Sequence, residues 1–148
     1  MKSIVVYSTR SGNTKKVAEA ISSELNCPCF RITSDSLSGG INDYDTVFIG
    51  TGIYKGQPHP DLLSYLQTMR LNGKKQFALF MTCFGWGKNV AVKNVIDKLG
   101  GALDANGQRM LNNHYSCFGG GLGFVKRGHP DAEELDAAKK WAREIARL

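Results

Sequence analysis

The chain has 148 residues, of which 42% are hydrophobic and 22% are charged, and its net charge is +6. Such a composition is ordinary for one globular domain with a core of its own, and the first apolar run is far too short for a signal peptide or a membrane span. The lysines and arginines are scattered and form no basic stripe, so we expect no nucleic-acid partner. We therefore expect a single cytoplasmic domain over residues 1–148 that does not bind membranes.

The four cysteines give no sign of a disulfide framework or a metal site. Cys27 and Cys29 are separated by a single proline, so a bridge between them would be strained, while Cys83 and Cys117 each stand alone in apolar surroundings. Zinc would need two spaced pairs of ligands, which the sequence lacks. We expect reduced, buried thiols and no metal.

Strand-like and helix-like patterns alternate along the chain, which predicts an α/β domain. The predicted strands are 4–7, 29–32, 46–50, 76–81 and an interrupted strand within 102–118 that is best defined over Tyr115–Phe118. The predicted helices are 15–25, 60–69, 90–99, which Gly100 and Gly101 should end, and 131–148. Five strands with intervening helices predict a doubly wound parallel sheet, in which ligands bind beyond the carboxyl ends of strands.

The first predicted strand leads into a turn rich in hydroxyl groups and then into a helix. The turn consists of Ser8, Thr9, Arg10, Ser11, Gly12, Asn13 and Thr14. Its hydroxyls, the Asn13 amide and the N–H groups at the start of the helix can donate hydrogen bonds, and the helix dipole favours an anion there. Gly12 permits a tight turn around an oxygen-rich group, so this segment predicts a phosphate site.

Loops with a different composition follow the third and fourth predicted strands. One contains Thr51, Gly52, Ile53, Tyr54 and Lys55, and the other contains Thr82, Cys83, Phe84, Gly85, Trp86 and Gly87. Aromatic residues placed between glycines can stack on a planar heterocycle. A phosphate at one end and a flat ring between two aromatic loops predict a mononucleotide, which we take to be a flavin.

At these residues the sequence resembles the flavodoxin family, specifically its short-chain members. Residues 9–14 fit the family's phosphate motif, S/T-x-T/S-G-x-T, and the loops 51–54 and 84–87 look like those that cover the two faces of the flavin. The resemblance spans the full chain. It implies a flavodoxin-like sheet of five strands in the order 2-1-3-4-5, with helices on both faces and FMN as the cofactor.

The resemblance also implies one-electron transfer, with no side chain acting as an acid, base or nucleophile. In the family a backbone carbonyl of the third-strand loop accepts a hydrogen bond from the reduced ring, a role that would fall here to Gly52 or Lys55. Backbone donors of Cys83, Phe84 and Gly85 would meet the pyrimidine end of the ring. The protein would supply binding and electrostatics, and the cofactor the redox chemistry.

The positive charge departs from the acidic pattern of most flavodoxins. Lys55 and Lys88 lie in the two loops expected to cover the ring, and a positive charge near the reduced ring stabilises it. This predicts a less negative potential for the second one-electron reduction than in acidic relatives. The redox partners of this protein, which we expect to be a monomer, would then be acidic-faced proteins.

Two other functions remain open from the sequence. A small FMN-dependent oxidoreductase on the same fold, such as a quinone reductase or a protoporphyrinogen oxidase-like enzyme, would have the same motifs. A module that has lost its flavin and binds a partner would be a third class.

The triplet His-Pro-Asp occurs twice, beginning at His59 and at His129. Both copies are interpreted as helix starts with proline at the first helical position.

Overall fold

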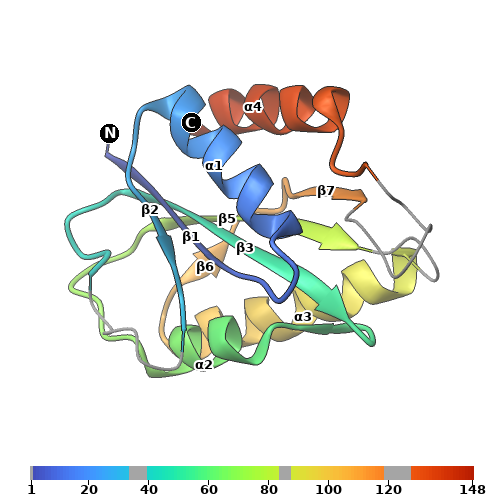
Figure 1. Ribbon diagram of the computed structural model, residues 1–148. Helices are drawn as coiled ribbons and strands as arrows, with labels where there is room; N and C mark the ends of the chain where they lie inside the picture. The colour runs from blue at the N-terminus through green and yellow to red at the C-terminus, as the bar shows by residue number, and fades with distance from the viewer. Residues whose placement is uncertain (1, 34–39, 84–87, 119–127) are drawn as a thin grey trace.

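The computed structural model describes residues 2–33, 40–83, 88–118 and 128–148 (Figure 1). Strands and helices alternate along the chain, as the sequence predicts. They are β1 (Ser3–Ser8), α1 (Asn13–Leu25), β2 (Cys29–Arg31), β3 (Thr46–Tyr54), β4 (Gln57–Pro58), α2 (Pro60–Thr68), β5 (Gln76–Cys83), α3 (Lys88–Ala105), β6 (Arg109–Met110), β7 (Tyr115–Phe118) and α4 (Ala132–Ala146).

The strands form one sheet whose central order is β2-β1-β3-β5-β6, with β7 also pairing with β5. All of these pairings are parallel, and only the short β4 runs antiparallel, beside β3. The segments β6 and β7 are the two parts of the interrupted fifth strand. The predicted order 2-1-3-4-5 is therefore confirmed.

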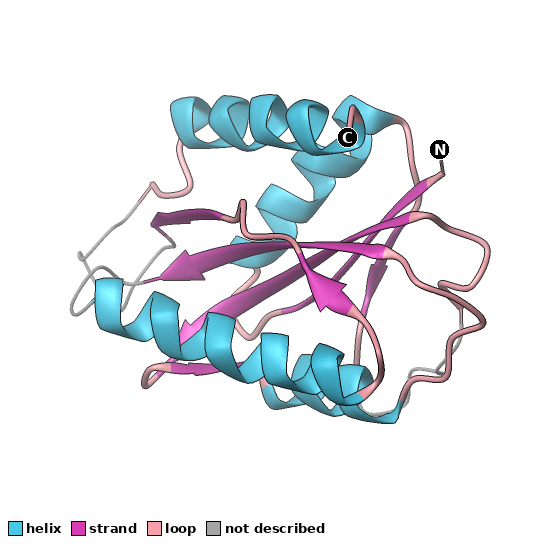
Figure 2. Ribbon diagram, turned by 180° about the vertical axis from the view of Figure 1, so that it is seen from behind, coloured by secondary structure: helices cyan, strands magenta, loops and turns pink. Residues whose placement is uncertain are grey.

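Helices cover both faces of the sheet (Figures 1 and 2). The helices α1 and α4 pack on one face, where Val5 and Tyr7 of β1 point, and α2 and α3 pack on the other face, where Ile4 and Val6 point. Because consecutive side chains of a strand point to opposite faces, a strand covered on both sides needs apolar residues at every position. This is why the strands are short uninterrupted apolar runs in the sequence.

The register of the sheet aligns the carboxyl ends of its central strands. Ser8 at the end of β1 lies opposite Thr51 of β3, and Gly52 of β3 lies opposite Thr82 of β5. The segments that follow β1, β3 and β5 therefore start from one edge of the sheet. This is the convergence on which the predicted cofactor site depends.

The predicted end of the third helix is wrong. Helix α3 passes through Gly100 and Gly101 and continues to Ala105. Each glycine costs about 1 kcal/mol relative to alanine inside a helix. Two residues beyond them, Ala102 and Leu103, are buried in the core on the α2 and α3 face, and this packing offsets the cost.

The third strand is longer than predicted. Strand β3 does not end at residue 50 but continues to Tyr54 and turns back into β4. The turn consists of Lys55 and Gly56, whose φ angles are +52° and +76°. Two residues with positive φ make the turn that matches the twist of a two-stranded hairpin. Most of the expected loop is therefore a hairpin, called here the third-strand hairpin (residues 51–59).

The two helix starts that the sequence interprets alike differ in the structure. Pro60 is the first residue of α2, as predicted. Pro130 instead precedes the cap of its helix, since Asp131 is the N-cap residue and α4 begins at Ala132. The interpretation of Pro130 as a first helical residue is therefore wrong.

The cysteines all lie in the described part of the chain, and none forms a disulfide bond. Cys83 and Cys117 are buried, as expected, whereas Cys27 and Cys29 are only half-buried. Burial raises the pKa of the Cys29 thiol to about 11, with a smaller contribution from Glu19. In the described residues, no helix is both long enough and apolar enough to cross a membrane.

Candidate functional site

The turn between β1 and α1, called here the hydroxyl turn (residues 8–14), brings several hydrogen-bonding groups to the start of a helix. Gly12 precedes α1 with a φ angle of +89°. Among the described residues no side chain caps the first turn of the helix, and that turn contains no acidic residue. The Gly12 amide donates to Thr9 Oγ1 over 3.1 Å, and the Asn13 side-chain amide donates to Ser11 Oγ over 2.9 Å. The donors and the absence of negative charge suit an anion.

Hydroxyl groups from three segments lie together beneath this turn. Thr14 Oγ1 lies 2.8 Å from Thr82 Oγ1, so the start of α1 is joined directly to the end of β5. Both residues are buried, as are Ser8, Thr9 and Thr51 at the same edge of the sheet, whereas Ser11 is exposed. Buried polar groups are costly unless they are bonded, so their concentration here fixes the geometry of the edge.

Ser8 contributes to this edge in a different way. Its hydroxyl donates to the Ile32 carbonyl over 2.8 Å and so joins the end of β1 to the chain after β2. Arg31 of β2 donates from Nη2 to the Thr9 carbonyl, also over 2.8 Å. Arg31 lies outside the sequence motifs that predict the site, but its place at the end of the strand beside β1 in the predicted order is a signal that points to it.

Hydrogen bonds hold the third-strand hairpin at its base and at its turn. Thr51 Oγ1 donates to the Gly52 carbonyl over 2.7 Å and accepts the His59 amide over 2.8 Å. At the turn, the Asn94 side chain of α3 donates to the Gly56 carbonyl. Of the two positions expected to offer a carbonyl to the reduced ring, Gly52 thus lies inside β3 with its carbonyl bonded, whereas Lys55 lies in the turn.

Tyr54 lies between the hairpin and the hydroxyl turn. Its hydroxyl accepts the Arg10 amide over 2.9 Å, and the Arg10 guanidinium carbon lies 4.6 Å from the centre of its ring. The His59 ring meets it edge-on, with centroids 5.6 Å apart. Gly52 makes room for this arrangement, because a Cβ atom there would come within 2.3 Å of the tyrosine oxygen.

The charges around Tyr54 are mainly positive. Burial lowers the pKa of His59, and of the nearby charges Asp61 raises it while Arg10 and Arg31 lower it further. The Nδ1 atom of His59 accepts the Asp61 amide over 3.1 Å, which caps the start of α2. The imidazole is therefore neutral and acts as a cap in the folded protein.

The third expected segment is described only in part. Thr82 and Cys83 end β5, next to the hydroxyl turn, and Cys83 Sγ donates to the Cys117 carbonyl of β7 over 3.6 Å. Phe84, Gly85, Trp86 and Gly87 lie outside the described residues, as does the side chain of Lys88. The structure therefore brings together the hydroxyl turn, the third-strand hairpin and the end of β5.

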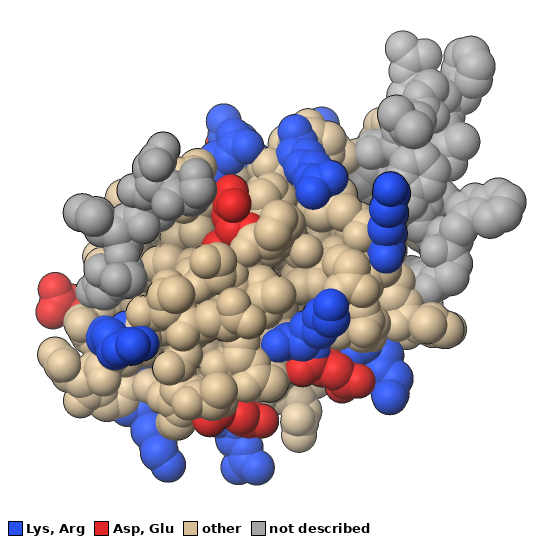
Figure 3. Space-filling model, turned by 90° about the horizontal axis from the view of Figure 1, so that it is seen from below, with Lys and Arg blue, Asp and Glu red and all other residues tan. Residues whose placement is uncertain are grey.

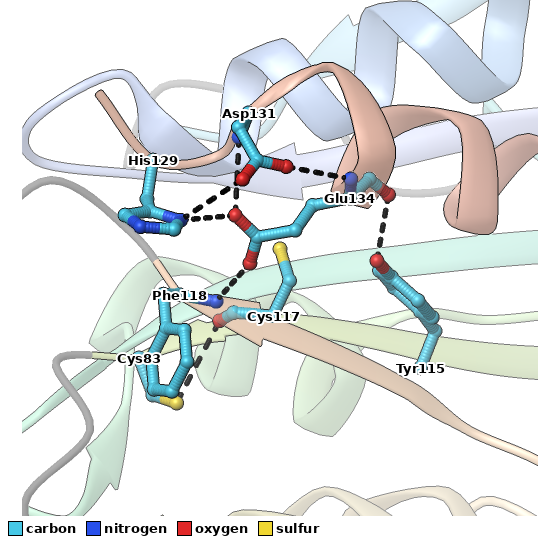
Figure 4. A network of polar contacts seen from close by, with 7 residues as sticks. All are labelled: Cys83, Tyr115, Cys117, Phe118, His129, Asp131 and Glu134. Carbon is cyan, nitrogen blue, oxygen red and sulfur yellow. Dashed lines mark hydrogen bonds and ion pairs between the residues drawn. The ribbon is translucent and has the colours of Figure 1, made fainter. Parts of the chain in front are cut away.

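A second polar cluster joins β7 to the start of α4 (Figure 4). Glu134 accepts the Phe118 amide over 2.9 Å and the Asp131 amide over 3.1 Å, and its Oε1 atom also contacts His129 Nδ1. Asp131 in turn accepts the Glu134 amide, which completes a capping box, and Tyr115 donates to the Glu134 carbonyl over 2.6 Å. These contacts form what we call the β7–α4 network.

The carboxylate of Glu134 is ionised in this network. Burial alone would raise its pKa, but the hydrogen bonds from His129, Asp131 and Phe118 outweigh burial, and the pKa is lowered. His129, Asp131 and Glu134 have possible metal-ligand atoms within 4.8 Å of one another, but these atoms already bond to each other and to backbone amides. The sequence of this segment predicts only a helix start, because nothing in it indicates the contact with β7.

One groove of the described structure lies elsewhere. It has a volume of about 390 Å³ and is lined mainly by apolar side chains of β1, β2 and α2, among them Ile4, Phe30 and Tyr65. None of the expected site residues that the structure describes lines it. It therefore gives no support to the predicted site.

Comparisons with known proteins agree with this geometry. The flavodoxin domain family matches residues 4–120. An uncharacterized protein of Methanocaldococcus jannaschii, MJ0298, is 29% identical, with 98% of each chain covered. Oxidised flavodoxin 1 of Bacillus cereus has a similar structure, with a TM-score of 0.72 and 21% identity over 99% of this chain and 98% of that one.

A further solved structure contains a ligand. The flavodoxin of Fusobacterium nucleatum bound to flavin mononucleotide has a TM-score of 0.70 to this chain and 16% identity, with 99% of this chain and 98% of that one covered. The sheet order and the converging strand ends define a doubly wound α/β domain of the flavodoxin-like fold. The family match covers most of the chain, so the protein belongs to the flavodoxin family.

Proposed function

We propose that this protein is an electron carrier of the flavodoxin type that binds FMN at the carboxyl edge of its sheet. The observation that carries the proposal is the meeting of three segments: the hydroxyl turn after β1, the third-strand hairpin and the end of β5. The contact between Thr14 and Thr82 and the contact between Arg10 and Tyr54 join them. Family membership and a relative solved with flavin mononucleotide support the choice of cofactor.

The donor set fits the phosphate of FMN. The start of α1 has no side-chain cap and no acidic residue in its first turn, and the hydroxyls of Thr9, Ser11 and Thr14 lie in the turn that precedes or opens it. A dianion gains from both the N–H groups and the helix dipole, and such charge-assisted bonds are the strong ones. These residues would hold the phosphate.

Tyr54 fits a role beside the flat ring. It is the aromatic side chain of the third-strand hairpin, and Arg10 and His59 hold it on two sides. When bound, FMN supplies the one-electron chemistry, and the chain supplies binding, orientation and electrostatics. Residues 84–87, which include Trp86, are proposed on sequence grounds to cover the other side of the ring.

The partners follow from charge as a proposal. The protein has a net charge of +6, and on the face covered by α2 and α3 the basic side chains are spread among acidic ones (Figure 3). Acidic-faced redox proteins would be attracted by the net charge rather than by a patch on that face, so the association should weaken steadily with added salt.

Binding of FMN and of riboflavin to the protein tests the proposal. Absorbance and flavin fluorescence should show one FMN bound per chain, and FMN should bind at least about a hundredfold more tightly than riboflavin, because only FMN has the phosphate. The exposed hydroxyl of α1 gives a matched control, since Ser23→Ala should leave this ratio unchanged. A protein that binds neither flavin, or binds both equally, would contradict the proposal.

A second candidate is a small FMN-dependent oxidoreductase on the same fold. The β7–α4 network favours it, because the Glu134 carboxylate holds the His129 imidazole, the side chain that most often transfers protons in enzymes, near the same edge of the sheet. Reduction of a quinone takes two electrons and two protons, so the assay supplies a reduced nicotinamide dinucleotide as the electron source. Steady turnover that His129→Asn abolishes would favour the enzyme, and its absence would favour the carrier.

A further inference from the structure

Arg10 differs from the other residues of the hydroxyl turn in what it contacts. The turn is expected to hold a phosphate, yet the Arg10 guanidinium lies over the Tyr54 ring, 4.6 Å from its centre, and the Arg10 amide donates to the Tyr54 hydroxyl over 2.9 Å. The two residues are 44 positions apart in the sequence. One residue thus makes two contacts between segments expected at opposite ends of the ligand.

These contacts fix the position of Tyr54 in several directions. The guanidinium covers one side of the ring, the His59 ring meets it at an interplanar angle of 81°, and the hydroxyl is held at the tip. A Cβ atom at residue 52 would come within 2.3 Å of the hydroxyl, so glycine at this position leaves the space that the hydroxyl occupies. A flat guanidinium suits this position better than the compact ammonium of lysine, because it stacks on an aromatic face.

The charge of Arg10 is also uncompensated locally. No ion pair of Arg10 is found in the described part of the chain, whereas its field helps to lower the pKa of His59, after burial. Arg10 and Lys55 are both exposed, so solvent and salt screen both charges, and what distinguishes Arg10 is its contact with Tyr54. Arg10 is held against Tyr54, so its charge keeps a fixed position.

We infer that Arg10 ties the hydroxyl turn to the third-strand hairpin and that its fixed charge makes the site bind reduced FMN more tightly relative to oxidised FMN. The inference rests on the proposed function. It assigns to Arg10 the effect on the potential that the sequence suggests for Lys55 and Lys88. Arg10 is in this sense a positioning residue for Tyr54 as well as a source of charge.

Four variants separate the two effects. Arg10→Gln removes both charge and stacking, Arg10→Lys keeps the charge, Tyr54→Phe keeps the ring without the hydroxyl, and Lys74→Gln removes one exposed charge just before β5, at the opposite end of the sheet. For each, we would measure the dissociation constant of oxidised FMN and the potentials of both one-electron couples. The affinity for each reduced form follows from these values.

Arg10→Gln should weaken binding of two-electron-reduced FMN about tenfold more than binding of one-electron-reduced FMN. The potential of the second one-electron couple, which joins these two forms, then becomes about 59 mV more negative. Arg10→Lys should leave the potential of the second couple near its wild-type value. It should bind oxidised FMN less tightly, because lysine holds the hairpin less well. Tyr54→Phe should also weaken binding while leaving the second couple near its wild-type value, and Lys74→Gln should leave both quantities unchanged. Equal shifts of the second couple in Arg10→Gln and Lys74→Gln would overturn the inference.

The tie itself can be tested without FMN. In NMR spectra of the protein alone, the Arg10 Hε should show nuclear Overhauser effects to the Tyr54 ring protons, and Tyr54→Phe should shift the Arg10 amide resonance. Absence of both signals would overturn the tie. If the tie is present but the wild-type protein does not bind FMN, the proposed function fails and the effect on affinity fails with it, so the two failures can be told apart.

Discussion

The carboxyl edge of the sheet contains two polar clusters of opposite character. At the end of β1 and the start of α1, neutral hydroxyls and backbone amides form the hydroxyl turn, which Arg10 joins to Tyr54 of β3. At the ends of β5 and β7, the ionised carboxylate of Glu134 contacts three donors, which are the Phe118 amide, the Asp131 amide and the His129 ring. An anion would be attracted to the first cluster and repelled by the second, so only the first suits a phosphate, and the second serves to join α4 to the sheet.

The largest effect should come from breaking the second cluster. Glu134→Gln places an amide where a carboxylate accepts three donors, so at least one donor loses its partner, and we expect the free energy of unfolding to fall by about 2–3 kcal/mol. Urea unfolding measures this. Glu133→Gln, at an exposed position in the same first turn, is the matched control and should cost much less. Loss of FMN binding without loss of stability would contradict the assignment of roles.

The same variant should change the pH dependence of stability. Because the pKa of Glu134 is lowered on folding from its reference value of 4.5, the unfolded chain takes up this proton first as the pH falls. The stabilisation is thus complete above about pH 5 and is lost as the pH falls through the lower pKa of the folded state. The difference in unfolding free energy between wild type and Glu134→Gln should shrink over this range, and a constant difference would contradict the explanation.

The first cluster should respond in binding rather than mainly in stability. Thr14→Val keeps the shape of the side chain but removes a buried hydroxyl that contacts Thr82, and we expect FMN to bind about 10–30 times more weakly, or about 1.5–2 kcal/mol. Calorimetric titration measures this change. Thr68→Val on α2 removes an exposed hydroxyl and should leave FMN affinity unaltered. A folded Thr14→Val protein with wild-type affinity would show that the phosphate binds elsewhere.

A smaller effect is expected at the turn of the third-strand hairpin. Gly56 has a φ angle of +76°, so Gly56→Ala should cost about 1 kcal/mol of stability. Gly73→Ala is the matched control, because that glycine has an ordinary φ angle and open space around it. Thermal unfolding of both variants checks the difference. Equal losses would indicate that the turn does not need its left-handed residue.

The smallest effect should be the titration of His59. Burial lowers its pKa from 6.5, so the unfolded chain binds this proton first, and the contribution of His59 to stability is complete above pH 6.5 and lost as the pH falls below it. Asparagine caps helices well and does not titrate, so His59→Asn should recover about 1 kcal/mol or less at pH 5 relative to pH 7.5. His114→Asn, at an exposed position, is the control for the other histidines. An unchanged pH profile would contradict a neutral His59.

The first cluster could be found in the sequence because its signal is local. Residues 8–14 are contiguous, and a strand, a hydroxyl-rich turn and a helix follow one another there. The sequence also contains a signal for the hairpin, because Lys55 and Gly56 can form a two-residue turn that ends in glycine. The apolar run before them nevertheless indicates an earlier strand end. The contact of Arg10 with Tyr54 could not be predicted, because it spans 44 residues and depends on the register of the sheet.

The contacts of the second cluster and the end of the third helix could not be predicted, for a related reason. Glu134 meets Phe118 across 16 residues, and a capping pattern says nothing about which strand lies beside the helix start. Glycines at 100 and 101 indicate a helix end by propensity, but the burial of Leu103 overrides propensity in the folded chain. Local chemistry was therefore predictable, whereas contacts set by packing were not.

The alignment of Ser8 with Thr51 and of Gly52 with Thr82 has a consequence for protein engineering. Inserting or deleting one residue within β1, β3 or β5 would turn every later side chain of that strand to the opposite face of the sheet. It would also move the residues at the strand end out of register with their neighbours. Connections beyond the strand ends carry no such restriction. Variants with new redox properties should therefore be sought by exchanging loops of different length, with the number of residues in each central strand left untouched.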